Sequence, residues 1–248
     1  MRDKEKAMKV IVSPSKTKKI KGIPTAPLFD AAMTERIVKH MQSLSLEAIG
    51  KALKLTSEKA IGVQEFFTHY DEAPTGCAAE SYNGLAFKNL SWETLDEESK
   101  AYGKDVLIVL SALYGVLTPE SPIKDYRLDL VDGVLKDRKE TLYDWWCPSV
   151  TSYFADEDWI LNLASKEYAK LVNHPRMVTV EFLEEKNGVW KQLSTSSKQM
   201  RGRLARYVLE KRVAQPSDLP EVLEDFVLAG IKSDESSLIT YRRQHKKM

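Results

Sequence analysis

The segment Ser13–Lys19, with the sequence SPSKTKK, places hydroxyl and ammonium groups in a loop directly after a short apolar run. That run, Met8–Val12, predicts a buried strand, and the following Ser-Pro pair predicts the loop that ends it. Backbone N–H groups of such a loop can hold a phosphate, while Lys16 adds a positive charge and Thr17 a hydroxyl. The loop lacks the glycines of a Walker loop, which disfavours nucleotide hydrolysis of that type, and a plain surface turn is the alternative.

A second group of cations lies on a predicted amphipathic helix, Ser196–Arg212. Lys198 and Arg201 are three residues apart and therefore share one face of that helix, and Arg206 lies five residues further along. Gly202 inside the helix costs roughly 1 kcal/mol relative to alanine, which indicates that another backbone or a ligand approaches closely there. A solvated basic face is an equally good interpretation of the same spacing.

The third candidate segment follows the apolar run Asp105–Ser111, the clearest buried strand in the sequence. Ligands of open α/β sheets usually bind beyond the carboxyl ends of the strands, so Ser111, Tyr114 and Arg127 are candidates to line a site. The alternative is a packed tyrosine, with the arginine paired to Asp125 or Asp129.

Conventional catalytic and metal-binding patterns are missing from the sequence. Its four histidines and two cysteines show no ligand spacing, and GxSxG, HExxH and GxGxxG do not occur. We therefore expect no metal site and no cofactor. The cysteines, Cys77 and Cys147, form no disulfide framework, which favours a reducing cytoplasm. No apolar run approaches the ~18 residues that cross a bilayer, and residues 1–14 lack the pattern of a secretory signal.

The chain is nearly neutral, with 37 basic and 36 acidic residues, but these charges are distributed unevenly along the sequence. Residues 1–22 contain eight basic and two acidic side chains, and residues 191–212 contain seven basic and one acidic side chain. If folding brings the two basic blocks onto one face, they can attract a polyanion. The alternative is two solvated faces. The basic ends, 1–7 and 243–248, are expected to be flexible.

The hydrophobic pattern predicts a single mixed α/β domain over residues 1–248. Residues 46–67 predict a helical hairpin, because Ser45 can cap one helix and Thr56 or Ser57 the next. Residues 105–111 and 159–165 predict buried strands, 113–130 a proline-broken loop, and 177–194 a hairpin. The segment 82–87, YNGLAF, predicts a strand or hairpin edge, and Pro148 predicts a kink or restart in the helix that begins near residue 141.

Five segments occur in a fixed order along the chain: SPSKT, SALYGVLTPESPIKDYRLDL, LYDWW, NLASKEY and SKQMRGRLARY. Together they resemble the YaaA family, bacterial cytoplasmic proteins of the peroxide stress response, and the resemblance spans Met8–Arg242. It implies an α/β domain with a positively charged cleft and a helix-hairpin-helix element. It also implies binding to single- or double-stranded DNA and protection of DNA from oxidative damage, linked to lowered free intracellular iron.

The resemblance also implies site residues, position by position. Ser13, Lys16 and Thr17 stand in the SPxKT segment, Tyr114 and Arg127 at the LYG and YRL positions, and Lys198, Arg201 and Arg206 on the basic helix. The hairpin residues Leu55, Thr56 and Ser57 would add neutral phosphate contacts. Ser15 and Met200 stand where the family often has alanine, and neither removes a charge.

Two functions are therefore expected at the same cleft. The first is binding of nucleic-acid phosphates without sequence readout. No membrane partner is expected, and a monomer is favoured although the sequence leaves the oligomeric state open. The alternative is an enzyme that acts on a nucleotide, nucleobase or nucleic acid, with Tyr114 and Lys198 as acid and base and Arg127 and Arg201 as anion clamps. A non-enzymatic role is preferred, and direct iron binding is disfavoured because no His/Cys/carboxylate cluster occurs.

Overall fold

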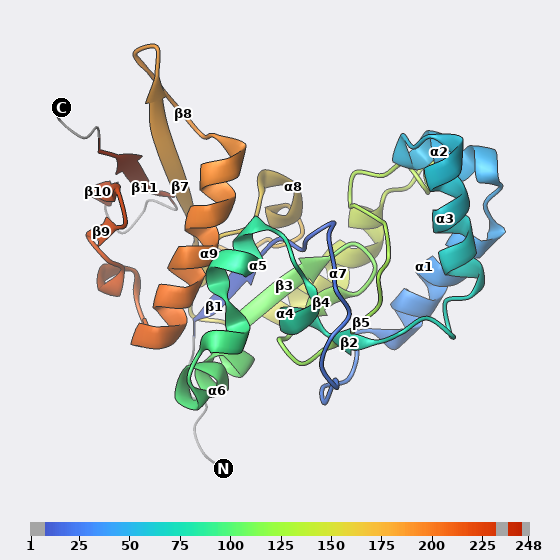
Figure 1. Ribbon diagram of the computed structural model, residues 1–248, viewed down its shortest axis with the longest axis horizontal. Helices are drawn as coiled ribbons and strands as arrows, with labels where there is room; N and C mark the ends of the chain where they lie inside the picture. The colour runs from blue at the N-terminus through green and yellow to red at the C-terminus, as the bar shows by residue number, and fades with distance from the viewer. Residues whose placement is uncertain (1–7, 232–237, 245–248) are drawn as a thin grey trace.

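The computed structural model describes residues 8–231 and 238–244, so the predictions for residues 1–7 and 245–248 lie outside the described residues. Its centre is a nine-stranded mixed sheet (Figure 1), in the order β4-β3-β1-β6-β7-β11-β10-β9, with β8 paired to β7. The strands are β1 (Lys9–Val12), β3 (Leu107–Ser111), β4 (Gly115–Leu117), β6 (Ile160–Asn162), β7 (Met177–Lys186), β8 (Val189–Lys191), β9 (Val222–Leu223), β10 (Phe226–Ile231) and β11 (Leu238–Arg243).

The order of the strands creates a switch point between β1 and β6. Strand β1 pairs in parallel with β3 on one side and with β6 on the other, and β6 pairs in parallel with β7. The chain runs from β1 to β3 in one direction and later returns past β1 to β6 and β7. Connections that leave in opposite directions open a crevice beyond the carboxyl ends of two such strands, and this is where ligands of open α/β sheets bind.

A small second sheet consists of β2 (Gly76–Cys77) and β5 (Pro122–Ile123). Helix α9 packs on β7, on α5 and on α6, and strand β3 is buried along its whole length. The helical elements are α1 (Ala31–Ser43), α2 (Leu46–Leu53), α3 (Ser57–Thr68), α4 (Ala78–Ser81), α5 (Leu85–Leu90), η1 (Trp92–Thr94), α6 (Glu97–Val106), η2 (Lys136–Arg138), α7 (Leu142–Phe154), α8 (Lys166–Ala169), α9 (Ser194–Lys211) and η3 (Pro216–Asp218).

The two helices expected in residues 46–67 are α2 and α3, which pack on each other. Ser45 caps α2 by accepting a hydrogen bond from the backbone N–H of Ala48, and Lys54 ends the helix with a left-handed backbone, at φ 53°. Thr56 stands at the N-cap of α3, but its side chain makes no capping hydrogen bond. Figure 1 shows α1, α2 and α3 at the opposite end of the long axis from β9 and β10.

Two local predictions were wrong, and a third was wrong in part. Residues 85–90 of the YNGLAF segment and its continuation form helix α5 instead of a strand, because this segment packs along α9 and makes only one isolated bridge, between Lys18 and Tyr82. The expected loop at 113–130 contains β4, which turns back onto β3 at Gly115, where φ is 69°. Helix α7 continues through Pro148, so the helix does not restart there, although the proline has no N–H to donate to the carbonyl group of Asp144.

The other predicted elements are present. The strands at 105–111 and 159–165 are β3 and β6, the hairpin at 177–194 is β7–β8, and the basic helix is α9. Arg243 is the last residue of β11. None of the helices in the described part of the chain is both long enough and apolar enough to span a bilayer.

Candidate functional site

A cavity of about 370 Å³ lies beyond the carboxyl ends of β1 and β6, at the switch point of the sheet. Four segments and Asp129 form its walls. The segments are residues 12–17 after β1, residues 84–87 at the start of α5, residues 163–168 after β6, and the first half of α9. Its polar lining residues are Ser13, Ser15, Lys16, Thr17, Asp129, Ser165, Glu167, Tyr168, Lys198 and Arg201. The fold thus brings Ser13, Lys16 and Thr17 together with Lys198 and Arg201, about 180 residues later in the chain.

Hydrogen bonds tie the two strand-end loops together and fix this side of the cavity. The backbone N–H of Ser165 donates to Oγ of Ser13 at 2.8 Å, and the two hydroxyl groups are 3.2 Å apart. The backbone N–H of Leu163 donates to the carbonyl group of Ile11 at 2.9 Å. Asn162, buried at the end of β6, accepts from the N–H of Ala164 at 2.9 Å. These contacts hold the hydroxyl groups of Ser13 and Ser165 at the cavity wall.

Asp129 organises the cations next to this loop. Its carboxylate lies 2.9 Å from Nζ of Lys16 and 2.7 Å from the guanidinium group of Arg127, and it accepts from the hydroxyl of Tyr168 at 3.2 Å. Burial alone would raise the pKa of Asp129, but the hydrogen bonds and charges of Lys16 and Arg127 outweigh it and lower the pKa. Of the alternatives left open for Arg127, pairing with Asp129 is the one that the structure shows.

Arg201 is a cation with unused hydrogen-bond donors. Its Nε atom is buried and has no hydrogen-bond partner, and none of its side-chain atoms is in a hydrogen bond or salt bridge within residues 8–231 and 238–244. Burial lowers the pKa of Arg201, while the negative charge of Glu181 opposes the shift. A guanidinium group stays protonated in proteins, so a buried one without a partner is costly until an anion pairs with it. Lys198, one helical turn earlier, is exposed at the same cavity.

Two residues expected at the site point elsewhere. Tyr114 is 1% exposed, and its hydroxyl accepts from the hydroxyl of Tyr70 at 3.2 Å and from the N–H of Lys124 at 3.1 Å. Arg206 donates to the carbonyl groups of Leu90 and Ser91, both at 3.1 Å, at the end of α5. Tyr114 is therefore a packed tyrosine, and Arg206 joins α9 to α5.

The turn between α2 and α3 lies next to the cavity rather than on it. Leu55 and Arg127 line a neighbouring cavity of about 290 Å³, which Lys16 also borders. Thr56 and Ser57 are exposed at the start of α3. Lys16 thus stands between the main cavity and the helical hairpin.

The close approach of a neighbouring backbone, and not of a ligand, explains why residue 202 is a glycine. A Cβ atom at this position would lie 2.0 Å from the carbonyl oxygen of Ala86 in α5. Because only a glycine permits this approach, Gly202 sets the distance between α5 and α9, which are two walls of the cavity.

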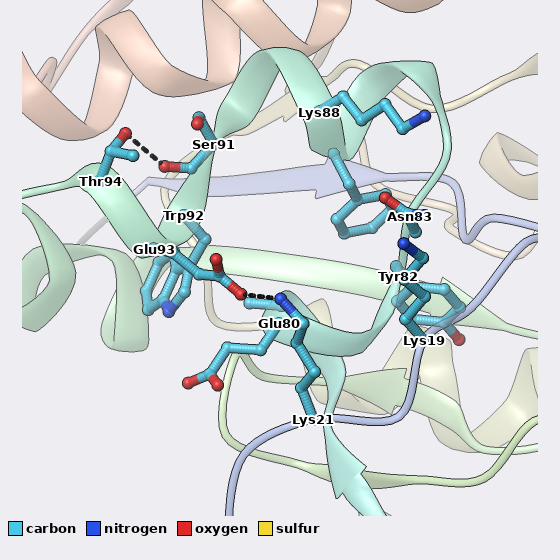
Figure 2. A pocket seen from close by; sticks show the side chains of 12 residues that line it. Lys19, Lys21, Glu80, Tyr82, Asn83, Lys88, Ser91, Trp92, Glu93 and Thr94 are labelled. Atoms are coloured by element: carbon cyan, nitrogen blue, oxygen red, sulfur yellow. Dashed lines mark hydrogen bonds and ion pairs between the residues drawn. The ribbon is translucent and has the colours of Figure 1, made fainter.

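A second cavity, of about 250 Å³, shares the lining residue Phe87 with the first. Figure 2 shows Lys21 reaching towards Glu93, at 2.8 Å, whereas Lys19 and Lys88 lie on the side of Asn83. From the sequence, Lys19 was predicted only as the last residue of the SPSKTKK loop, and Lys21 only as part of a basic block. No signal pointed to Lys88, because the helical character of this segment was not expected.

Glu167 and Tyr168 also line the cavity and were not predicted from the sequence. Both lie in the NLASKEY segment directly after β6, the strand beside β1, and that position was the available signal. Among residues 8–231 and 238–244, no three His, Cys, Asp or Glu side chains are arranged so that they could hold a metal ion.

The sequence of the chain matches a known protein family. The family model described as peroxide stress protein YaaA matches residues 8–231. The chain is 28% identical over 249 residues to a UPF0246 protein of Fusobacterium nucleatum, covering 95% of this chain and 99% of the relative. It is 30% identical over 228 residues to one of Acaryochloris marina (86% and 90%) and 31% identical over 243 residues to one of Finegoldia magna (94% and 97%). With its switch-point cavity and its SPSKT and RGRLAR segments all inside the matched region, the chain belongs to the peroxide stress protein YaaA family.

Proposed function

We propose that this protein binds nucleic acid, DNA above all, as part of the peroxide stress response, and that backbone phosphates occupy the cavity between β1 and α9. One observation carries the proposal: Lys16, Lys198 and Arg201 line a single cavity although they come from opposite ends of the chain. Cations and hydroxyl groups that contact phosphates fix a protein on nucleic acid without reading its sequence.

The hairpin of α2 and α3 supplies a second contact in this proposal, in the manner of a helix-hairpin-helix element. Its turn borders the same small cavity as Lys16 and Arg127, so one strand can reach both places. The exposed N-terminal turn of α3, a helix of 12 residues, offers backbone N–H groups and the positive end of its dipole.

The physiological role that we propose follows the family. A cytoplasmic protein that covers the phosphate backbone during peroxide stress would limit oxidative damage to DNA. Its effect on free iron would then be indirect, through the DNA that it protects or through other proteins.

A second candidate function, an enzyme acting on a nucleotide, nucleobase or nucleic acid, is favoured by the position and size of the cavity. It lies where α/β enzymes bind their substrates, and carboxyl groups accompany its cations. Lys198 remains available as an acid or base, and Arg201 as an anion clamp. Tyr114 does not reach the cavity, so this function would depend on Lys198 and on the carboxyl groups. Turnover of a nucleotide or DNA substrate by the purified protein would establish it.

The test of DNA binding is fluorescence anisotropy of the wild-type protein with labelled single-stranded and duplex DNA of unrelated sequences at several salt concentrations. Affinity should fall steeply with salt, with a slope of about −0.9 per phosphate contact on duplex DNA and about −0.7 on single strands, because bound cations are released. It should vary little between sequences. No binding at low salt, or binding that is insensitive to salt, would contradict the proposal.

A further inference from the structure

We infer that the cavity takes one nucleoside monophosphate unit, with its phosphate against Lys16, Lys198 and Arg201 and with a donor of its base or sugar on the carboxyl group of Glu167. The inference rests on the proposed function, because it concerns the same cavity. It goes further in assigning a ligand class and a recognition residue.

Glu167 has an acceptor atom that none of the residues described by the structure uses. It is the second residue of α8 and lines the cavity, and its Oε1 atom is buried without a hydrogen-bond partner. The other carboxylate of the cavity differs, since Asp129 is occupied by Lys16, Arg127 and Tyr168. A ligand that donates an N–H or O–H group to Glu167 would satisfy the free oxygen.

The surroundings of Glu167 disfavour its ionised form, although the backbone N–H of Val131 and the charge of Lys16 oppose this effect. Burial, followed by the nearby negative charge of Asp129, raises the pKa of Glu167. A carboxyl group with a higher pKa in the folded than in the unfolded state stabilises the fold only at low pH, and this contribution is lost as the pH rises through the folded pKa. At neutral pH, the ionised carboxylate of Glu167 is therefore held less favourably in the folded than in the unfolded state, as expected for a group retained for binding.

The residues that line the cavity are complementary to a nucleotide rather than to a phosphate alone. Its volume of about 370 Å³ falls within the ~300–1,000 Å³ of small-molecule sites. Three cations and several hydroxyl groups can hold a phosphate, and Leu85, Phe87 and Leu163 add apolar surface on which a base can lie. A phosphate alone would contact neither the apolar wall nor Glu167. A nucleoside monophosphate can contact the cations, the apolar wall and Glu167.

This ligand can come from two sources, as a free nucleotide or as one nucleotide turned out of a strand. A strand would continue past Phe87 into the second cavity, where Lys19 and Lys88 lie (Figure 2). Lys88→Ala should therefore weaken binding of a short single-stranded oligonucleotide and leave binding of a mononucleotide unchanged. If the oligonucleotide is unaffected, the free nucleotide is the ligand.

The test is isothermal titration of the wild-type protein with AMP, GMP, CMP, UMP and inorganic phosphate. At least one monophosphate should bind at least tenfold more tightly than inorganic phosphate. Glu167→Ala should remove about tenfold of that preference, since a hydrogen bond to a charged group contributes roughly 1.5 kcal/mol or more. Glu221→Ala, which removes the same charge from an exposed position near β9, should change nothing.

Thermal unfolding of Glu167→Gln separates a binding role from a structural one. This variant should melt at a higher temperature than the wild type at pH 7 and lose that advantage at pH 4. A lower melting temperature at pH 7 would contradict the inference. Monophosphates that bind no better than inorganic phosphate would overturn it as well. If DNA still binds in a salt-dependent manner in that case, the proposed function stands and only the nucleotide inference fails. If neither monophosphates nor DNA bind, the inference and the proposed function both fail.

Discussion

Replacing Lys198 and Arg201 together by alanine is expected to weaken DNA binding by about 100-fold at low salt. Each side chain offers charge-assisted hydrogen bonds to a phosphate, worth roughly 1.5 kcal/mol or more apiece, and each 1.4 kcal/mol is a factor of ten in affinity. Arg201 has no hydrogen-bond partner among the described residues, so its donors are available without breaking another contact. The salt dependence should flatten by about 0.9 per lost contact on duplex DNA.

A matched double variant controls for overall charge. Lys191→Ala/Lys211→Ala removes two positive charges from exposed positions on β8 and at the end of α9, away from the cavity. This variant should bind DNA nearly as well as the wild type at physiological salt, where distant charges are screened. If both double variants weaken binding equally, the attraction comes from total charge and the cavity has no special part in it.

The second large effect is on stability, at Gly202. Alanine there should destabilise the protein by about 1–3 kcal/mol, the cost of overpacking, although alanine favours a helix by roughly 1 kcal/mol over glycine. The added Cβ atom would lie 2.0 Å from the carbonyl oxygen of Ala86, so α5 and α9 must separate. Urea unfolding should show a lower midpoint with an unchanged slope.

Gly62 provides the comparison for this substitution. It lies inside α3, and a Cβ atom added there meets nothing within 4 Å. Gly62→Ala should therefore stabilise the protein by about 0.5–1 kcal/mol through helix propensity alone. If Gly202→Ala stabilises the protein as Gly62→Ala does, helix propensity, and not the contact with Ala86, decides the effect at Gly202.

Local patterns predicted most of the elements but not all. Strands β1 and β3 and helix α9 could be predicted because their apolar residues form continuous or periodic runs. Helix α5 could not, since its six residues are held by packing against α9, more than 100 positions later. Strand β4 was hidden for a similar reason, because it pairs with β3 across a turn that looks like a loop.

The site shows the same division. Lys16, Lys198 and Arg201 were identifiable as cations in a loop and on a helix face, but their meeting at one cavity depends on the order of the strands. The role of Glu167 was beyond the sequence, because an unused carboxylate oxygen is a property of the surroundings. Tyr114 lies in a family segment, yet its hydroxyl is taken up inside the core by Tyr70 and Lys124.

The central claim is that nucleic acid binds in the cavity between β1, β6, α5 and α9, and hydrogen–deuterium exchange of the wild-type protein tests it most directly. With a saturating single-stranded oligonucleotide, exchange should slow at residues 13–17, 84–88, 163–168 and 194–202, which form or border the cavity. Slowing at the α2–α3 turn is expected as well. Protection confined to β8–β11, or to the hairpin with no change at the cavity, would contradict the account.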